Sequence, residues 1–337
     1  MVRLKDCRWS AARERFLRSA QPAGVLLSDS LPPSAEATRE LLLKIANALP
    51  RPPFLAIRQE GGPRDPLRRF LPALPSPRAA QKGLSAVARL GEISGKTLSL
   101  LGFNTNFAPT LDLRPDTFGS DPALVAQCGG AFLRGLKQHR ILACGKHFPG
   151  LGSVPLGDSP SRRVSGKPMA ALWREDLLPF RELLRLLPMV LISSAAYQAY
   201  DFNKPRPASQ SPNVVEGLLR IKMGYRGLAL AYDLDSERAG GSLPVGEAAI
   251  QSLNAGCDLL VLDQEASCET VGEALRAGIE SGELSRARVE QALERVRAAR
   301  QGLRHPPRTV SRRALEGLVR RMESFAREFG CEEGKIA

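Results

Sequence analysis

The sequence predicts an α/β protein folded as a single-domain (β/α)8 barrel of the TIM type. Short apolar segments alternate with longer amphipathic segments along the 337 residues, and this alternation is typical of right-handed βαβ units that form a parallel sheet. About seven such apolar segments over roughly 300 residues favour a closed barrel over an open sheet. The chain lacks the glycine-rich phosphate-binding motifs, so nothing in it indicates a nucleotide-binding fold.

The predicted strands are short apolar runs that end in polar or turn-forming residues. Phe54-Leu55-Ala56-Ile57, for example, runs directly into Arg58. Strand lengths of four to eight residues between turn signals fit a buried parallel sheet. The strands are expected at residues 23–27, 54–57, 103–109, 141–145, 189–193, 228–231 and 258–262. The eighth strand of the barrel is not placed by this pattern.

The predicted helices lie between these strands. Ser34 has the character of an N-cap, and Asp121-Pro122 has the N-cap and first-turn pattern. The helices are expected at residues 34–49, 85–101, 122–136, 168–187, 212–223, 245–255, 267–281, 286–303 and 310–329. Without a linker-like break, we expect one domain over residues 1–330 and a short tail at 331–337.

Charge and composition narrow the classes of function. The formal net charge is +13, but the basic residues are spread along the chain without an aromatic-interleaved motif. Such a distribution indicates a basic solvated surface, so we expect no nucleic-acid partner. No apolar run approaches the roughly 20 residues that span a bilayer, and the N-terminus does not resemble a signal peptide. We therefore expect a cytoplasmic protein without a membrane partner.

The six cysteines are scattered and form neither a CxxC motif nor a metal-ligand cluster. Cys144 and Cys257 lie in apolar segments and are expected to fill the core. We expect free thiols, no metal site and no cofactor. A monomer is the expected oligomeric state.

One stretch has the features of a ligand site. Lys146 and His147 follow the predicted strand at residues 141–145, and a Pro-Gly-Leu-Gly turn leads from them to a polar loop that contains Asp158. In parallel α/β barrels the carboxyl ends of the strands carry the chemistry. The position of this stretch therefore predicts a binding or catalytic site.

Several motifs in order identify a resemblance. Lys-His-Phe-Pro-Gly at residues 146–150, followed by Asp158-Ser159, resembles the signature of glycoside hydrolase family 3, in particular its single-domain β-N-acetylglucosaminidases, also called β-N-acetylhexosaminidases. Further segments match in sequence order at residues 59–62, 106–113, 118–122, 224–228 and 255–258. The resemblance implies a barrel of the (β/α)8 type and a carbohydrate ligand that contains N-acetylglucosamine.

The resemblance also implies a mechanism. Retaining glycosidases need a nucleophile and a separate acid/base close together on opposite sides of the bond that is cleaved. In the family the nucleophile is an aspartate, and the acid/base is a histidine paired with an aspartate on the loop after the Lys-His strand. Lys146 and His147 match residues that contact the sugar in the family.

The chain departs from the family pattern at the catalytic positions. The nucleophile position is Tyr232 and the acid/base position is Pro160. Three sugar-contacting positions also differ, because Arg58 replaces an aspartate, Asp116 an arginine and Ser194 a histidine. Arg58 and Asp116 could face one another across the pocket as an ion pair.

Two functional interpretations follow. In the first, catalysis is impaired, because a retaining hydrolase needs both a nucleophile and a proton donor, and the chain has a residual sugar-binding or scaffold role. In the second, the chain is an active glycosidase that uses Asp233 and Asp158 in rearranged roles.

Three single residues also have two interpretations each. Asp158 is either a general acid or a cap of its turn. His147 is either a sugar ligand or a hydrogen-bonded core histidine. Lys146 is either a sugar ligand or the partner of a carboxylate such as Asp112 or Glu60.

Overall fold

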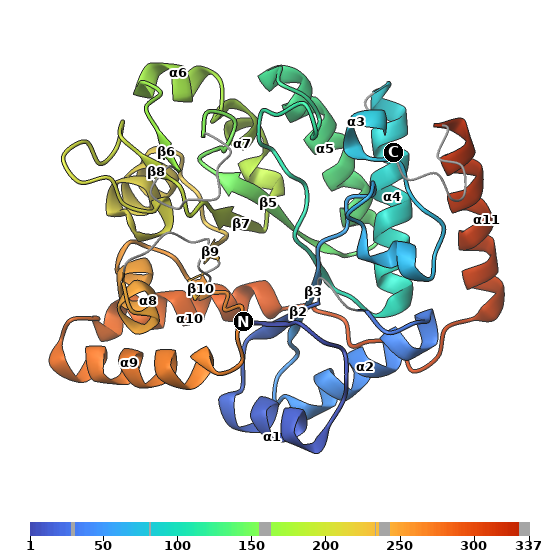
Figure 1. Ribbon diagram of the computed structural model, residues 1–337, viewed down its shortest axis with the longest axis horizontal. Coiled ribbons are helices and arrows are strands. Elements are labelled where there is room, and N and C mark those ends of the chain that lie inside the picture. The colour runs from blue at the N-terminus through green and yellow to red at the C-terminus, as the bar shows by residue number, and fades with distance from the viewer. Residues whose placement is uncertain (28–30, 81, 155–162, 233, 236–242, 330–337) are drawn as a thin grey trace.

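Eight parallel strands form the centre of the protein, and helices surround them (Figure 1). The computed structural model describes residues 1–27, 31–80, 82–154, 163–232, 234–235 and 243–329. In spatial order the strands are β1 (Val2–Leu4), β2 (Gly24–Leu27), β3 (Phe54–Ile57), β4 (Thr105–Asn106), β5 (Leu142–Phe148), β7 (Met189–Ile192), β9 (Leu228–Ala231) and β10 (Leu259–Leu260). The order follows the chain, as expected for repeated βα units.

The sheet closes on itself through its first strand. Val2 forms a parallel bridge with Leu262, the N–H of Arg3 donates to the Leu262 carbonyl, and the Leu262 N–H donates to the Met1 carbonyl. This closure confirms the predicted (β/α)8 barrel. It also supplies the missing strand, because β1 is the eighth strand that the apolar pattern did not reveal.

The helices agree with the predicted ranges in most places. The expected helix at residues 168–187 is divided into three short helices, and α1 was not predicted. The helices are α1 (Ala11–Ala20), α2 (Ala35–Ala48), η1 (Pro66–Arg69), α3 (Pro77–Ala80), α4 (Leu84–Leu101), α5 (Pro122–Gln138), α6 (Met169–Arg174), α7 (Leu178–Leu183), η3 (Leu184–Leu186), η4 (Ala208–Gln210), η5 (Asn213–Lys222, a π-helix), α8 (Val245–Asn254), α9 (Ser267–Ser281), α10 (Arg286–Arg300) and α11 (Arg312–Glu328). A two-stranded pair, β6 (Val164–Ser165) with β8 (Ala196–Tyr197), lies outside the barrel. In the described part of the chain, no helix is long and apolar enough to cross a bilayer.

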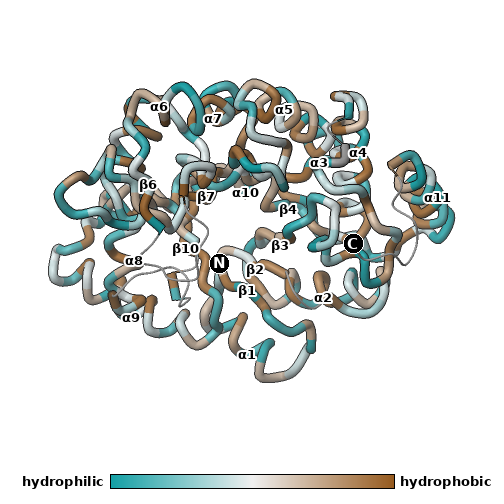
Figure 2. The backbone as a smooth tube through the Cα atoms, turned by 45° about the horizontal axis from the view of Figure 1, so that its top comes forward, coloured by the Kyte–Doolittle hydropathy of each residue, from teal (hydrophilic) through white to brown (hydrophobic). Residues whose placement is uncertain are grey.

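Strand alternation separates the barrel interior from the layer beneath the helices. Leu26, Ala56 and Leu230 belong to an interior cluster, whereas Val25 and Leu55 belong to the larger cluster under the helices. Successive strand residues point to opposite faces, so both faces of these strands are buried, as the uninterrupted apolar runs predicted. Helices that cover such a barrel must be amphipathic, and in Figure 2 they alternate between hydrophobic and hydrophilic residues.

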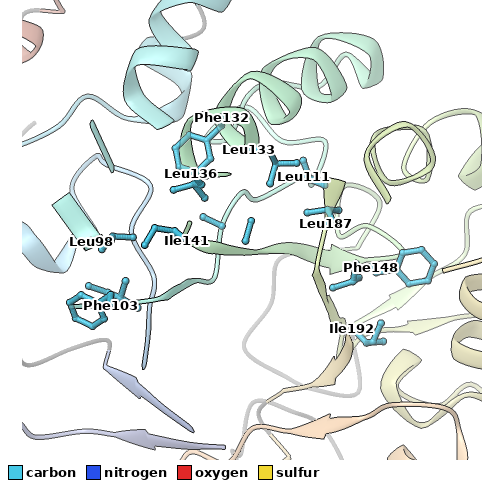
Figure 3. Packing of buried hydrophobic residues seen from close by; sticks show 14 of the residues in the cluster. Leu98, Phe103, Leu111, Phe132, Leu133, Leu136, Ile141, Phe148, Leu187 and Ile192 are labelled. Atoms are coloured by element: carbon cyan, nitrogen blue, oxygen red, sulfur yellow. The ribbon is translucent and has the colours of Figure 1, made fainter. Parts of the chain in front are cut away.

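Strand β5, which leads to the predicted site, is anchored in the larger cluster. Figure 3 shows Ile141 beside the start of β5 and Phe148 at its far end, with Phe132 and Leu136 of α5 packed alongside. Phe148 meets Phe180 of α7 edge-on, with ring centroids 5.3 Å apart. The strand is therefore held by packing at both ends.

Two further features hold the outer layer. Helix α11 packs on α4 through buried Leu318, Met322 and Phe325, which explains its amphipathic pattern.

The buried carboxylate of Asp258, just before β10, accepts hydrogen bonds from three arginines. Arg220 of η5 is one donor, and the others are Arg288 and Arg295 of α10, at 2.9 Å and 2.8 Å. One buried anion thus joins two helices to the sheet.

Candidate active site

Lys146 lies at the carboxyl end of β5 and is almost completely buried, with 8% of its surface exposed. Its ammonium group is 2.5 Å from Glu60 Oε1 and also donates to the Phe107 carbonyl. Glu60 is itself fixed by the Thr110 hydroxyl, which lies 3.0 and 2.9 Å from its two oxygens. The predicted ion pair of Lys146 with a barrel carboxylate is therefore confirmed, with Glu60 as the partner. A contact of Lys146 with sugar stays a prediction.

His147 is held by Asp112, which follows β4. The Asp112 carboxylate accepts hydrogen bonds from His147 Nδ1 at 2.8 Å, from the His147 backbone N–H at 3.2 Å and from the Leu151 N–H at 2.9 Å. The imidazole is 29% exposed and Asp112 only 3%. Because Nδ1 faces Asp112, the opposite ring nitrogen Nε2 is directed away from it. The histidine is thus oriented by a buried carboxylate and still reaches the surface.

The ionisation of Asp112 fits this arrangement. Burial acts to raise the pKa of Asp112, but the neighbouring His147 and the N–H donors of His147 and Leu151 outweigh burial and hold the pKa below its ordinary value. The carboxylate is therefore charged at neutral pH. A charged Asp112 favours the Nδ1–H tautomer of His147.

The turn after His147 is packed against the protein. Gly150 has φ +126°, and an added Cβ there would lie 2.8 Å from the Asp176 Cβ. The Tyr197 hydroxyl donates to the Gly150 carbonyl at 2.7 Å. The turn is therefore held closely, and Leu151 within it packs against the core.

The segment after β3 is tied to β4. The Gln59 N–H donates to Asn106 Oδ1 at 2.9 Å, and Asn106 Nδ2 donates to the Gln59 carbonyl at 2.7 Å. Gln59 Nε2 donates to Asp65 at 2.9 Å. Burial raises the pKa of Asp65 to about 6.

Arg58 and Tyr232 meet inside the barrel. The Arg58 guanidinium carbon lies 4.6 Å from the centre of the Tyr232 ring, within the range of a cation–π contact. Arg58 follows β3 and Tyr232 follows β9, the third and seventh strands in the spatial order. In a closed eight-stranded barrel these strands are opposite one another, so the contact crosses the barrel axis.

Cys144, Lys146 and Arg58 face the same interior space of the barrel. Burial raises the pKa of Cys144 to about 12, and Lys146 and Arg58 both act to lower it. Cys144 belongs to the barrel interior. Lys146 follows Cys144 by two residues and Arg58 follows the interior residue Ala56 by two, so strand alternation directs both side chains toward the interior. We refer to the end of the barrel formed by Arg58, Lys146, His147 and Tyr232 as the barrel mouth.

The remaining predicted site residues do not join this group. Asp116 is exposed, with 68% of its side chain accessible, and pairs with Arg114 at 3.5 Å. The structure thus shows different partners for Asp116 and Arg58 from the ion pair that the sequence suggested. Ser194 is half-buried in the loop after β7. Asp233, Asp158 and Pro160 lie outside the described residues.

The sequence analysis missed another charged pair at this end of the barrel. Arg3 Nη1 lies 2.9 and 3.2 Å from the two oxygens of Asp263. Arg3 follows the interior residue Met1 by two positions, and Asp263 follows the interior residue Val261 by two. The alternation of side chains along β10 could have predicted that Asp263 faces the barrel interior. The position of Arg3 could be predicted only after β1 had been recognised as a strand.

The fold and this site define the class of protein. In this closed (β/α)8 barrel, Lys146, His147 and their carboxylate partners lie at the carboxyl-terminal end of the strands. Residues 3–299 match the family model of the glycosyl hydrolase family 3 N terminal domain. The chain belongs to this family.

Relatives within the family are similar over most of the chain. A β-hexosaminidase from Alkalilimnicola ehrlichii is 32% identical over 280 residues, which are 78% of this chain and 79% of the relative. A β-hexosaminidase from Pseudomonas aeruginosa is 30% identical over 284 residues, or 80% of this chain and 83% of the relative.

Solved structures agree on the fold. A family 3 β-N-acetylglucosaminidase from Paenibacillus superposes with a TM-score of 0.84 at 26% identity, covering 96% of this chain and 66% of that one. NagZ from Neisseria gonorrhoeae, at 23% identity, shares the fold with a TM-score of 0.78 over 98% of this chain and 97% of that one. This chain therefore spans about two thirds of the Paenibacillus protein and nearly all of the Neisseria protein.

Proposed function

We propose that this protein is a β-N-acetylhexosaminidase-like member of family 3 that binds an N-acetylhexosamine-containing glycan at the barrel mouth and has lost most or all hydrolytic activity. Relatives named β-hexosaminidases at about 30% identity support the ligand class. The observation that carries the loss of activity is the Arg58–Tyr232 contact across the barrel axis.

The chemistry of a retaining hydrolase requires a nucleophile at the anomeric carbon and a proton donor at the leaving oxygen. A phenol stands at the nucleophile position, and a guanidinium covers its ring. The acid/base position is a proline, which has no titratable group. Losing both groups removes interactions that act in the transition state, so we expect the rate to fall by several orders of magnitude.

The binding half of the proposal rests on Lys146 and His147. Both match sugar-contacting positions of the family, and each is oriented by a carboxylate, Glu60 or Asp112. A side chain fixed before binding loses little entropy when a ligand arrives. His147 is the better candidate for direct contact, because its imidazole reaches the surface.

The first experiment measures hydrolysis of an aryl β-N-acetylglucosaminide by the wild type and by Asp233→Ala and Asp158→Ala. We expect all three proteins to stay at background. Turnover by the wild type that either substitution reduces by orders of magnitude would establish the alternative, an active glycosidase that uses Asp233 and Asp158 in rearranged roles.

The second experiment measures N-acetylglucosamine binding by calorimetry. A hydrogen bond between His147 and a sugar hydroxyl is worth about 1 kcal/mol, so His147→Ala should weaken binding by about fivefold. His139→Ala is the matched control, because His139 lies 3.4 Å from a carboxylate, Glu92, on the outer layer. If the wild type does not bind the sugar, the binding half is wrong and a scaffold role takes its place.

A further inference from the structure

A cavity lies at the amino-terminal end of the barrel, opposite the mouth. It has a volume of about 560 Å³ and is bounded by the end of α5, the start of β5, the connection from η3 to β7 and residues 301–303 after α10. Volumes of about 300–1,000 Å³ are typical of small-molecule sites. Neither the family signature nor the proposed sugar site involves these segments.

The walls of this N-terminal cavity are apolar. Leu133 of α5 and Leu187 before β7 are core residues, and Figure 3 shows them on the same side of β5. Leu142 and Leu303 pack against the barrel interior and also line the cavity. Leu186 stands at the edge with 38% of its surface exposed, which is unusual for a large apolar side chain in this protein. The cavity therefore offers an apolar surface that a ligand could cover.

The charged lining residues all have the same sign. Lys137, Arg140 and Arg185 line the cavity, and the described residues of the lining include no aspartate or glutamate. Within the described part of the chain, none of these three side chains takes part in an ion pair, in contrast to arginines such as Arg13, Arg89 and Arg295. Arg140 has φ +57°, where the chain reverses from α5 into β5. Three cations that form no ion pair with a described residue thus line one largely apolar cavity.

We propose that the N-terminal cavity binds a small amphipathic anion, an aliphatic or aryl body that ends in a carboxylate, sulfonate or phosphate. The apolar body would cover Leu142, Leu187 and Leu303, and the anionic group would lie among the three cations. Desolvation of the apolar body supplies the main attraction, and the cations select the sign of charge. The cavity is concave and bounded on several sides, so it fits a free small ligand better than the flat surface of a membrane. This proposal is independent of the sugar site.

The test is calorimetric titration with decanoate, a ten-carbon carboxylate. Acetate has the same charge without the chain, and decyltrimethylammonium has the chain with the opposite charge. We expect decanoate to bind one site per chain and the other two to show no saturable binding. Equal binding of decyltrimethylammonium would overturn the role of the cations. Binding to phosphatidylglycerol vesicles without binding of decanoate would overturn the small-ligand assignment.

Substitutions locate the site. Each exposed ion pair is worth about 0.2–1 kcal/mol, so the combined Lys137→Gln, Arg140→Gln and Arg185→Gln variant should weaken decanoate binding about tenfold. Arg134→Gln is the matched control, because Arg134 is an exposed arginine of α5 outside the lining. An unchanged affinity in the triple variant would refute the proposal.

A second pair of variants tests the apolar wall. Leu186→Asp places a negative charge at the edge and should abolish decanoate binding. Leu84→Asp changes a similarly exposed leucine of α4, at 44% exposure, that does not line the cavity, and it should leave binding intact. Both positions are exposed, so both proteins should fold. Equal affinities in the two variants would place decanoate elsewhere.

Discussion

Asp112 is the residue whose removal should disturb the barrel mouth most clearly. Its carboxylate accepts three hydrogen bonds, two from backbone N–H groups and one from the His147 imidazole. Asp112→Ala removes all three acceptor contacts at once in a buried position. The backbone N–H groups of His147 and Leu151 then lose their partners, and the turn after β5 loses its connection to the end of β4.

The magnitude follows from the kind of bond. Each deprived N–H costs about 1 kcal/mol, at the lower end of the usual range because both groups are only partly buried. The charge-assisted bond to the imidazole contributes about 2 kcal/mol more. We expect Asp112→Ala to lower the free energy of unfolding by about 4 kcal/mol, and Asp112→Asn, which keeps one acceptor oxygen, by about half as much.

Equilibrium urea unfolding, followed by the fluorescence of Trp9 and Trp173, measures this loss. Asp116→Ala is the control, because Asp116 is a 68% exposed aspartate of the same loop and should change the free energy of unfolding by less than about 0.5 kcal/mol. The reasoning is refuted if Asp112→Ala costs less than about 1 kcal/mol or matches the control.

The pH dependence gives a second measurement on the same residue. The pKa of Asp112 is lower in the folded protein than in the unfolded chain, so its contribution is present above the unfolded pKa and is lost as the pH falls through the folded one. The difference between the wild type and Asp112→Asn should therefore shrink below about pH 4. A difference that stays constant into acid would contradict the assignment.

Three further perturbations test other parts of the structure. A double-mutant cycle with Arg58→Met and Tyr232→Leu should give a coupling of about 0.5–2 kcal/mol in unfolding free energy. A coupling of zero would show that the contact between the two side chains does not stabilise the fold. The raised pKa of Asp65, about 6 in the folded state, means that the folded protein holds the proton more tightly. Stability should therefore fall by about 2 kcal/mol as the pH rises from about 4 to 6, and Asp65→Asn should lack this slope when thermal midpoints are compared across that range. Asp258→Asn should destabilise the protein by about 3–5 kcal/mol in urea, because three arginines lose their shared anion, and a loss below about 1 kcal/mol would show that water replaces it.

The sequence revealed most of the barrel because its strands are buried on both faces. Apolar runs such as Leu228–Ala231 stand out from the amphipathic helices around them. Strand β1 did not stand out, because its three residues include Arg3, whose side chain reaches the mouth and pairs with Asp263. Its place in the barrel depends on pairing with residues about 260 positions away, which no local pattern records.

The site could be predicted only in its local parts. A lysine at a buried strand end needs an anion, so the partnership of Lys146 with Glu60 followed from chemistry and position. The contact between Arg58 and Tyr232 depends on strand register and on which strands face one another across the axis. The suggested pairing of Arg58 with Asp116 failed to account for Arg114, a nearer cation for Asp116.

The contact across the barrel axis also couples what a substitution at residue 58 does to what a substitution at residue 232 does. An aspartate introduced by Tyr232→Asp alone would stand beneath the Arg58 guanidinium and form an ion pair, which lowers the nucleophilicity of the carboxylate. An Arg58→Asp change alone would place a carboxylate over a phenol and still leave no nucleophile at residue 232. Under the proposed function, we therefore expect neither substitution alone to give hydrolytic activity. We therefore expect the effects of substitutions at residues 58 and 232 to be non-additive.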